Sequence, residues 1–224
     1  YHDSNIEHIK YTDIDYHVFT NGSSAIVSSR SPYNDPEYRY SPIVALIFVP
    51  NILINEHVGK LMLILADIFC GHLIYLLSIY QGTYRQQSKQ ALLVWLFNPV
   101  TLAISTRGNF EPIQSLILLS LVYLLIRNHY ILAGTLYGLA IHLRLYPAIY
   151  SITLYGFMVQ KKPFIITQRR LSYWVKTLSP GTRQVKFFLA SGLSFIVSSY
   201  CSFRYYGNDY LEQSFFYHLK RKDL

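Results

Sequence analysis

Two aspartates, Asp13 and Asp15, are separated by one residue among the aromatic and hydroxyl side chains of YTDIDY at 11–16. A carboxylate in such surroundings can take the proton from an attacking hydroxyl group. The two carboxylates could alternatively hold a hard divalent cation that neutralises a leaving phosphate. We expect no obligatory metal cofactor, because cationic side chains can neutralise the phosphate instead. An ordinary Asp-rich turn without a function is the third interpretation of this aspartate pair.

A second cluster, HLRLYP at 142–147, places His142, Arg144 and Tyr146 at the end of an apolar run. Cationic side chains inside such a run are unfavourable unless they face water or a partner. The phosphate of a lipid is a natural partner for a guanidinium, so these three residues are candidates for substrate binding. Arg144 could instead extend its head group to the membrane interface.

A tight turn is predicted at 105–112, where Arg107, Asn109 and Glu111 offer hydrogen bonds to a sugar or a phosphate. Gly108 would allow the backbone to approach a ligand closely. A plain connection between two helices would have the same composition, so the turn alone does not establish a site.

Arg39 lies between Tyr38 and Tyr40. This arginine could bind a phosphate together with Tyr40, or it could stack on its aromatic neighbours. Asp67 and His72 fall inside a long apolar run, and we expect them to face other helices and to form hydrogen bonds there.

Composition indicates that these residues are carried by membrane helices. Hydrophobic residues make up 51% of the chain and charged residues 14%, which is more apolar than a soluble domain of this length. Runs such as 61–80 exceed the roughly 18 apolar residues that indicate a span. The net charge of +8 comes from basic residues between these runs, so we expect no nucleic-acid partner. Cys70 and Cys201 predict neither a disulfide nor a metal cluster.

The predicted fold is therefore an all-α integral membrane protein, with an aqueous loop at 1–42 and a membrane-spanning region at 43–224. Turn signals such as Asn21-Gly22-Ser23 support the loop. Asn98-Pro99 and Tyr146-Pro147 break apolar runs, and broken backbone in a membrane implies a cavity that covers it. The expected membrane segments are an interfacial one at 43–56 and spans at 61–80, 91–105, 113–127, 130–143, 147–160 and 187–203.

The basic segment at 161–186 predicts the orientation, because loops rich in Lys and Arg stay on the cytoplasmic side. The basic residues at 220–222 go against this assignment. Asn21-Gly22-Ser23 fits an N-glycosylation acceptor on the lumenal side. Every candidate cluster then falls on the same lumenal face, which comprises the loops 1–42, 106–112, 143–147 and 204–224.

Taken together, a series of short motifs resembles one family, the catalytic subunit of glycosylphosphatidylinositol (GPI) mannosyltransferase I, a GT-C class of membrane glycosyltransferase. The resemblance runs from about residue 11 to the end of the chain. The motifs are YTDIDY at 11–16, SPY at 31–33, YRYSP at 38–42, FNP at 97–99, STRGN at 105–109, HLRLYP at 142–147 and FFYHLKRKD at 215–223.

The resemblance implies a protein of the endoplasmic reticulum membrane with a lumenal active site in a multi-spanning GT-C-like bundle. It would add the first, alpha-1,4-linked mannose from dolichol-phosphate-mannose to glucosaminyl phosphatidylinositol, beside a single-span stabilising subunit. The D-x-D aspartates of the family fall on Asp13 and Asp15, and its basic residue before Tyr-Pro falls on Arg144. Asn21 stands where relatives often carry Asp. Relatives have an earlier first span and further spans after the last motif, so we interpret the chain as a fragment.

The mechanism that follows is a single displacement with inversion. One aspartate of the pair deprotonates the acceptor hydroxyl, while Arg144, with Arg39 or Arg107, stabilises the leaving phosphate. Three alternatives remain: another dolichol-dependent transferase, for example one acting on lipid-linked oligosaccharide; a multi-spanning transporter, since charged residues inside spans also mark substrate pathways; and a non-catalytic assembly subunit.

Overall fold

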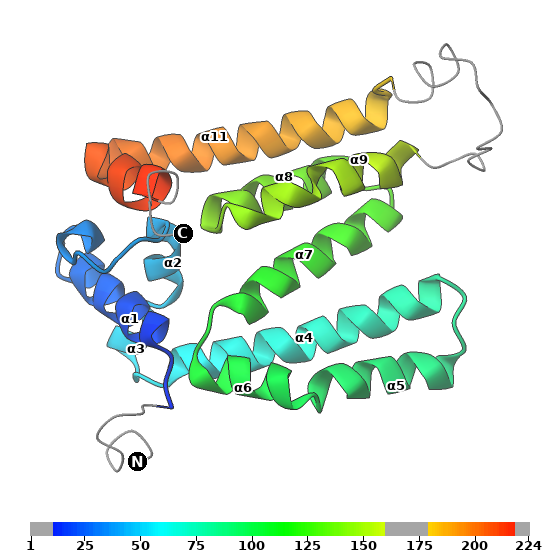
Figure 1. Ribbon diagram of the computed structural model, residues 1–224, viewed down its shortest axis with the longest axis horizontal. Coiled ribbons are helices and arrows are strands. Elements are labelled where there is room, and N and C mark those ends of the chain that lie inside the picture. The colour runs from blue at the N-terminus through cyan, green and yellow to red at the C-terminus, as the bar shows by residue number, and fades with distance from the viewer. Residues whose placement is uncertain (1–10, 160–178, 218–224) are drawn as a thin grey trace. The chain divides into compact units, whose positions relative to one another are not determined.

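The computed structural model describes residues 11–159 and 179–217. All regular structure in these ranges is helical, which confirms the predicted all-α class (Figure 1). The chain forms two compact units. The first holds the described residues up to Leu119 and those from Ser199 onward, and the second holds those between Ser120 and Ser198. We describe each unit by itself.

The first helix, α1 (Ile14–Val27), occupies much of the segment that we predicted to be a loop. Asp13 starts it as the N-cap residue. The predicted turn at Asn21-Gly22-Ser23 lies inside this helix. Gly22 does not form a turn there but allows close packing, since a Cβ atom at this position would lie 2.6 Å from the ring of Tyr38. The hydroxyl of Ser23 is buried and donates to the backbone oxygen of Ala45 at 2.6 Å, an unfavourable setting for glycosylation.

Two Ser-Pro pairs and Asn98-Pro99, which we predicted to be a break, start helices. In each, the side chain of the first residue caps the helix and the proline takes the first helical position, where no backbone donor is needed. Ser31 starts the short 3-10 helix η1 (Pro32–Asn34), and Ser41 starts α2 (Pro42–Ile47). A further short helix, α3 (Pro50–Leu53), follows directly.

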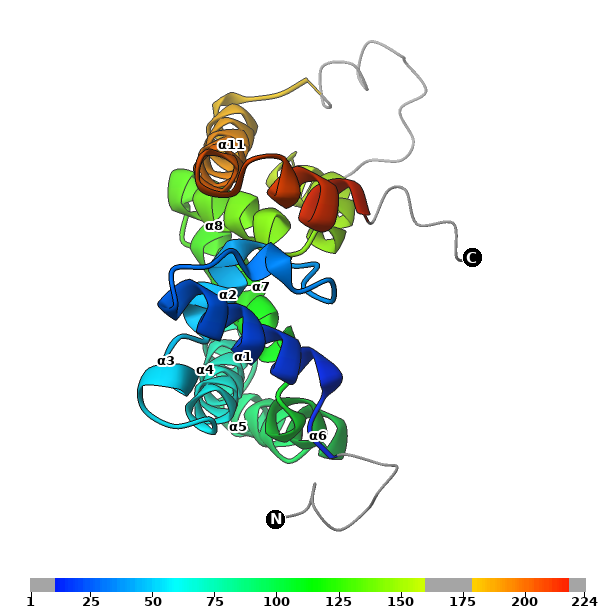
Figure 2. The same ribbon diagram turned by 90° about the vertical axis from the view of Figure 1, so that its left-hand side faces the viewer.

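The longest apolar run forms α4 (Val58–Tyr80), which contains the predicted span at 61–80. It packs against α5 (Arg85–Leu96) and α6 (Pro99–Arg107). Figures 1 and 2 both show α4 and α5 side by side. The predicted span at 91–105 is wrong as one helix, because Asn98 caps a new helix at Pro99.

Asp67 of α4 is buried, as we expected for a charged residue inside this helix. His72 is exposed instead, so the expectation that it faces other helices is wrong for this chain.

Helix α7 (Glu111–Ile126) follows α6 after a bend of 118°. Within the described residues, two helices are long and apolar enough to cross a membrane, Val58–Tyr80 and Thr182–Phe216, and the bent α6–α7 pair would make a third. The predicted spans at 130–143 and 147–160 correspond to helices that are too short for this criterion, and the predicted span at 187–203 is part of Thr182–Phe216. The larger number of spans in our prediction is therefore not confirmed.

The second unit contains α8 (Tyr130–Leu143), the 3-10 helix η2 (Tyr146–Tyr150), α9 (Ser151–Val159) and the first part of α11 (Thr182–Tyr210). The predicted break at Tyr146-Pro147 is confirmed, since α8 ends at Leu143. Gly134 and Gly138 let α8 approach α11 closely, because a Cβ atom at either position would overlap a backbone oxygen of α11. This is the small-residue packing typical of membrane helices.

Near its end, α11 is interrupted at Gly207 (φ 61°, ψ −141°) and leads into the π-helix η3 (Leu211–Phe216). There, the rings of Tyr206 and Tyr210 pack on that of Tyr33, in a hydrophobic cluster that also contains the buried side chain of Val18 from α1. Most of the basic segment at 161–186 and the basic residues at 220–222 lie outside the described residues.

Candidate active site around the aspartate pair

The two carboxylate oxygens of Asp13 make two different contacts. Oδ1 accepts a hydrogen bond from the backbone N–H of Asp15 at 3.1 Å. Oδ2 accepts one from Nδ2 of Asn109 at 3.1 Å. Asp13 thus caps a helix and also binds a residue 96 positions away in the sequence.

Further hydrogen bonds join the segments 11–16 and 105–111. The backbone N–H of Asp13 donates to the oxygen of Arg107 at 2.8 Å, and Nε of Arg107 donates to the oxygen of Tyr11 at 3.1 Å. The hydroxyls of Tyr11 and Thr106 lie 2.6 Å apart. Two of the clusters that we selected from the sequence are therefore brought together at one end of the first unit.

Gly108 has a different role from the one that we predicted. It ends α6 with a left-handed backbone (φ 93°), and a Cβ atom there would lie 2.5 Å from the ring of Tyr16. The close approach that glycine permits is therefore used by Tyr16 and not by a ligand. Glu111 begins α7, and its backbone N–H donates to Oδ1 of Asn109 at 3.0 Å, which fixes the amide of Asn109 for its contact with Asp13.

A hollow of about 470 Å³ lies beside Asp13, Arg107 and Asn109; we call it the Arg107 hollow. Its remaining lining comes from the apolar side of α6: Pro99, Val100, Ala103 and Ile104. A cation and hydrogen-bonding groups at one end of an apolar surface suit a ligand with a polar head and a hydrocarbon tail.

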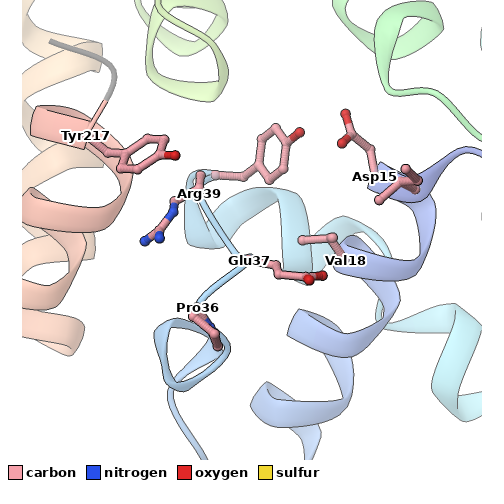
Figure 3. A pocket seen from close by; sticks show the side chains of 8 residues that line it. Asp15, Val18, Pro36, Glu37, Arg39 and Tyr217 are labelled. Carbon is pink, nitrogen blue, oxygen red and sulfur yellow. The ribbon is translucent and has the colours of Figure 1, made fainter. Parts of the chain in front are cut away.

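A second hollow, of about 420 Å³, lies beside Asp15, Glu37, Arg39 and Tyr40; we call it the Arg39 hollow. Figure 3 shows side chains from α1, from the segment before α2 and from the residue after η3 around it. Arg39 stacks on Tyr217, with Cζ 4.3 Å from the ring centroid. The stacking partner is therefore Tyr217 and not a sequence neighbour of Arg39, and the phosphate contact of Arg39 stays a prediction.

The aspartate pair therefore contributes to two different hollows. The reason is local geometry, because residues two apart at a helix start do not face each other. Among the residues that the structure describes, no three His, Cys, Asp or Glu side chains converge into a metal-binding group.

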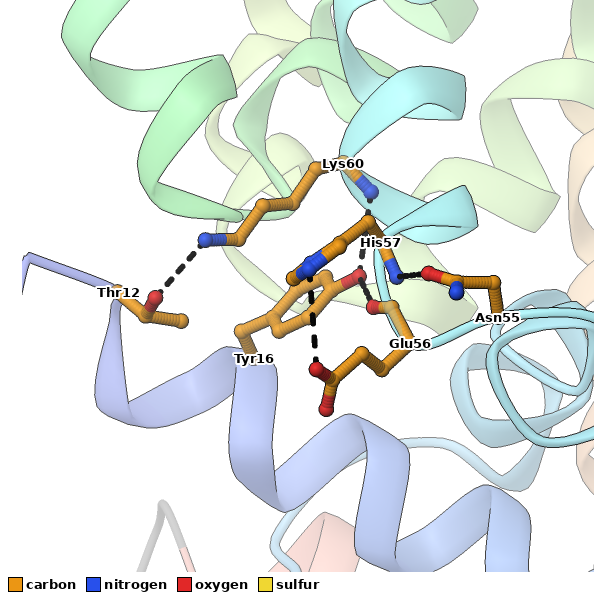
Figure 4. Close-up of polar contacts among 6 residues, drawn as sticks. All are labelled: Thr12, Tyr16, Asn55, Glu56, His57 and Lys60. Atoms are coloured by element: carbon orange, nitrogen blue, oxygen red, sulfur yellow. Dashed lines mark hydrogen bonds and ion pairs between the residues drawn. The ribbon is translucent and has the colours of Figure 1, made fainter. Parts of the chain in front are cut away.

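A third group of contacts fixes the flanks of the aspartate pair (Figure 4). The phenol of Tyr16 donates to the backbone oxygen of Glu56 at 2.5 Å and accepts from the backbone N–H of Lys60 at 3.2 Å. Nζ of Lys60 donates to Oγ1 of Thr12 at 2.8 Å. Burial raises the pKa of Tyr16 above its usual value, so the phenol keeps its proton as a donor.

His142, Arg144 and Tyr146 belong to the second unit and are described within it. His142 is buried, with its ring 6.3 Å from that of Phe195. Arg144 follows the last turn of α8 in an extended conformation, and Tyr146 is 39% exposed. The hydroxyl of Tyr137 stabilises the break by donating to the backbone oxygen of Pro147 at 3.0 Å.

Some residues of the site were not selected from the sequence. Glu37 and Tyr217 line the Arg39 hollow, and Lys60 contacts Thr12. Tyr217 lies inside the motif at 215–223. Lys60 carried one usable signal, since it is a charged residue at the very start of a long apolar run.

Comparison with known proteins gives consistent similarities. A family model described as mannosyltransferase (PIG-M) matches residues 104–224. The chain is 35% identical to a Dictyostelium discoideum protein named GPI mannosyltransferase 1, over 96% of this chain and 50% of that protein. A Danio rerio protein named GPI alpha-1,4-mannosyltransferase I, catalytic subunit, is 33% identical over 96% of this chain and 53% of its own.

A Saccharomyces cerevisiae protein named GPI mannosyltransferase 1 is 33% identical over 100% of this chain and 53% of its own. The chain thus spans about half the length of the curated relatives that it matches. These alignments include the aspartate pair and the turn that binds it.

Proposed function

Because this chain belongs to the PIG-M mannosyltransferase family, we propose that the whole protein transfers mannose from dolichol-phosphate-mannose to glucosaminyl phosphatidylinositol. The names of its relatives, one of them an alpha-1,4-mannosyltransferase catalytic subunit, support this choice of reaction. The observation that carries it is the hydrogen bond between Asp13 and Asn109, because it unites the two polar segments into one site between two hollows.

Asp15 acts as the general base in this proposal. Its side chain lines the Arg39 hollow, where an acceptor with hydroxyl and phosphate groups can be held. The Asp15 carboxylate takes the proton of the acceptor 4-hydroxyl, whose oxygen forms the new bond to the anomeric carbon of mannose. The bond from that carbon to the phosphate breaks with its electron pair, and dolichyl phosphate leaves. The beta-linked donor gives an alpha-linked product by inversion.

Asp13 positions this base and does not take the proton itself. Its two oxygens already accept hydrogen bonds from the backbone of Asp15 and from Asn109. Those bonds fix the start of α1 relative to the turn at 105–111. The side chain that starts the helix therefore determines where the next acidic side chain points.

The donor phosphate is held in the Arg107 hollow. The apolar residues of α6 provide a surface for a hydrocarbon tail, and the guanidinium stabilises the negative charge that grows on the leaving phosphate. We propose that Arg144 adds a second positive charge to this phosphate in the full-length protein. Glycan tags or protease protection that located Asp13 and Arg144 in different compartments would exclude this part of the proposal.

The remaining features also belong to the proposal. The protein resides in the endoplasmic reticulum membrane with its site on the lumenal side, as a multi-pass protein beside a single-span stabilising subunit. The apolar helices α4 and Thr182–Phe216 support the membrane location.

The test uses the full-length protein in cells that lack this transferase. Microsomes receive radiolabelled dolichol-phosphate-mannose with either glucosaminyl phosphatidylinositol or lipid-linked oligosaccharide as acceptor. We expect label on the phosphatidylinositol acceptor only, and surface GPI-anchored proteins should return in the intact cells. Label on the oligosaccharide alone would assign the chain to another dolichol-dependent reaction, and no covalent transfer to either acceptor would refute the proposal.

A further inference from the structure

Lys60 is a cation that the proposed mechanism does not use. It is half-buried at the first turn of α4, and its ammonium donates to the hydroxyl of Thr12 at 2.8 Å. The same ammonium lies 5.4 Å from the ring centroid of Tyr16. Among the residues that the structure describes, it makes no ion pair with a carboxylate. Its partners are therefore neutral groups of the segment that carries the aspartate pair.

The backbone of Lys60 contacts the same segment. Its N–H donates to the phenol of Tyr16 at 3.2 Å, and that phenol donates to the oxygen of Glu56. The preceding N–H, of Gly59, donates to Oδ1 of Asn51 at 2.6 Å. The first N–H groups of a helix have no partner within that helix. Helix α4 is thus capped by side chains from α1 and α3.

The positions of these contacts along the chain give Lys60 its significance. Thr12 directly precedes Asp13, and Tyr16 directly follows Asp15. One residue therefore holds both flanks of the aspartate pair, with its ammonium on one side and its backbone N–H on the other (Figure 4).

We propose that Lys60 is a positioning residue that fixes the aspartate pair on the start of α4. This inference rests on the proposed mannosyl transfer. Lys60 touches no substrate in it; it acts through Thr12 and Tyr16 on the direction of the Asp15 carboxylate. Small displacements of a catalytic group are costly, since an error of about 1 Å can lower a rate about a hundredfold. Loss of the ammonium should therefore lower kcat more than it changes KM.

The test compares variants of the full-length protein in the microsomal assay, each normalised to its amount in the membrane. Lys60→Met keeps the length of the side chain and removes the donor. Lys60→Arg keeps a cationic donor. The matched control is Lys89→Met, which removes an exposed lysine of α5.

A hydrogen bond from a charged donor is worth enough to change a rate about tenfold or more. We expect Lys60→Met to lower kcat by about that factor with KM changed less than about twofold. Lys60→Arg should recover most of the rate, and Lys89→Met should equal the wild type. Wild-type kcat in Lys60→Met, or failure of Lys60→Arg at normal protein level, would overturn the inference.

Variants of Thr12 test the role of Lys60 independently, and they keep the inference testable if Lys60→Met is unstable. Thr12→Val removes the acceptor while keeping the shape, and Thr12→Ser keeps the hydroxyl. We expect a loss of kcat in Thr12→Val and not in Thr12→Ser, and no additional loss when Thr12→Val and Lys60→Met are combined. Losses that multiply in the double variant would overturn the inference. Absence of transfer in the wild type and in Lys89→Met would instead refute the proposed function.

Discussion

Replacing Asp15 by asparagine keeps the shape of the side chain and removes its ability to accept a proton. Asp15 lines the Arg39 hollow, and its carboxylate is the base in the proposed reaction. General base catalysis contributes about 10²- to 10⁴-fold to a rate. We therefore expect Asp15→Asn to lower the rate of mannose transfer by at least about a hundredfold.

Asp13→Asn is the matched variant, and its expected loss is smaller. Asparagine caps a helix about as well as aspartate does, so the N–H of Asp15 keeps its acceptor. The amide presents only one oxygen, and the contact with Nδ2 of Asn109, 3.1 Å long in the native chain, is lost. One such hydrogen bond is worth about 1–3 kcal/mol. We expect roughly a tenfold loss of rate, since about 1.4 kcal/mol corresponds to a factor of ten.

Initial rates in microsomes from cells lacking the transferase measure both variants, with the amount of each protein determined by immunoblot. Asp13→Ala and Asp15→Ala should both abolish transfer while the protein persists, because alanine removes the helix cap in one case and the base in the other. A larger loss in Asp13→Asn than in Asp15→Asn would refute our assignment of the base. Normal rates in both asparagine variants would remove the aspartate pair from the chemistry.

Three further predictions concern helix packing and helix capping, and the melting temperature of the purified full-length protein in detergent tests each. Gly108→Val should lower stability by more than about 1 kcal/mol, because its backbone is left-handed and its Cβ atom would overlap Tyr16. Gly138→Leu should lower the melting temperature by separating α8 from α11, whereas Gly156→Ala, in open space, is the control. Asn51→Ala should cost about 1–3 kcal/mol, since it leaves the N–H of Gly59, in the first turn of α4, without its acceptor.

Each of these has a contradicting result. An unchanged melting temperature for the valine or leucine variant would show that the close approaches are not required. Equal effects of Gly138→Leu and of its control would refute the helix-packing argument. For Asn51→Ala, an intact melting temperature would show that water replaces the amide as the cap.

The sequence predicted the helical class and several boundaries well, because apolar runs determine them directly. The run at 61–80 lies within α4, and the one at 130–143 coincides with α8 to within a residue. Prediction failed where the same short motif can occur either in a turn or in a helix. Asn98-Pro99 both ends one helix and caps the next, and Gly22 in α1 is a packing residue in a segment that has the composition of a loop.

The candidate site was predicted in part. The segments 11–16 and 105–111 were both selected, because carboxylates, arginine and asparagine stand out in an apolar chain. Their direct contact depends on tertiary structure, which no local pattern encodes. Lys60 was overlooked for the same reason, since its significance lies in Thr12, 48 positions earlier in the sequence.

The N-cap at Asp13 couples the stability of one helical turn to the chemistry of the site. Helix ends unravel more readily than helix interiors, and whenever the first turn of α1 opens, the carboxylate that should receive a proton swings away from its hollow. Activity should then fail at temperatures or denaturant concentrations well below those that unfold the membrane helices. If the proposed reaction is correct, inactivation of the full-length protein by mild stress would thus be local and reversible, and it would precede any loss of the helical fold.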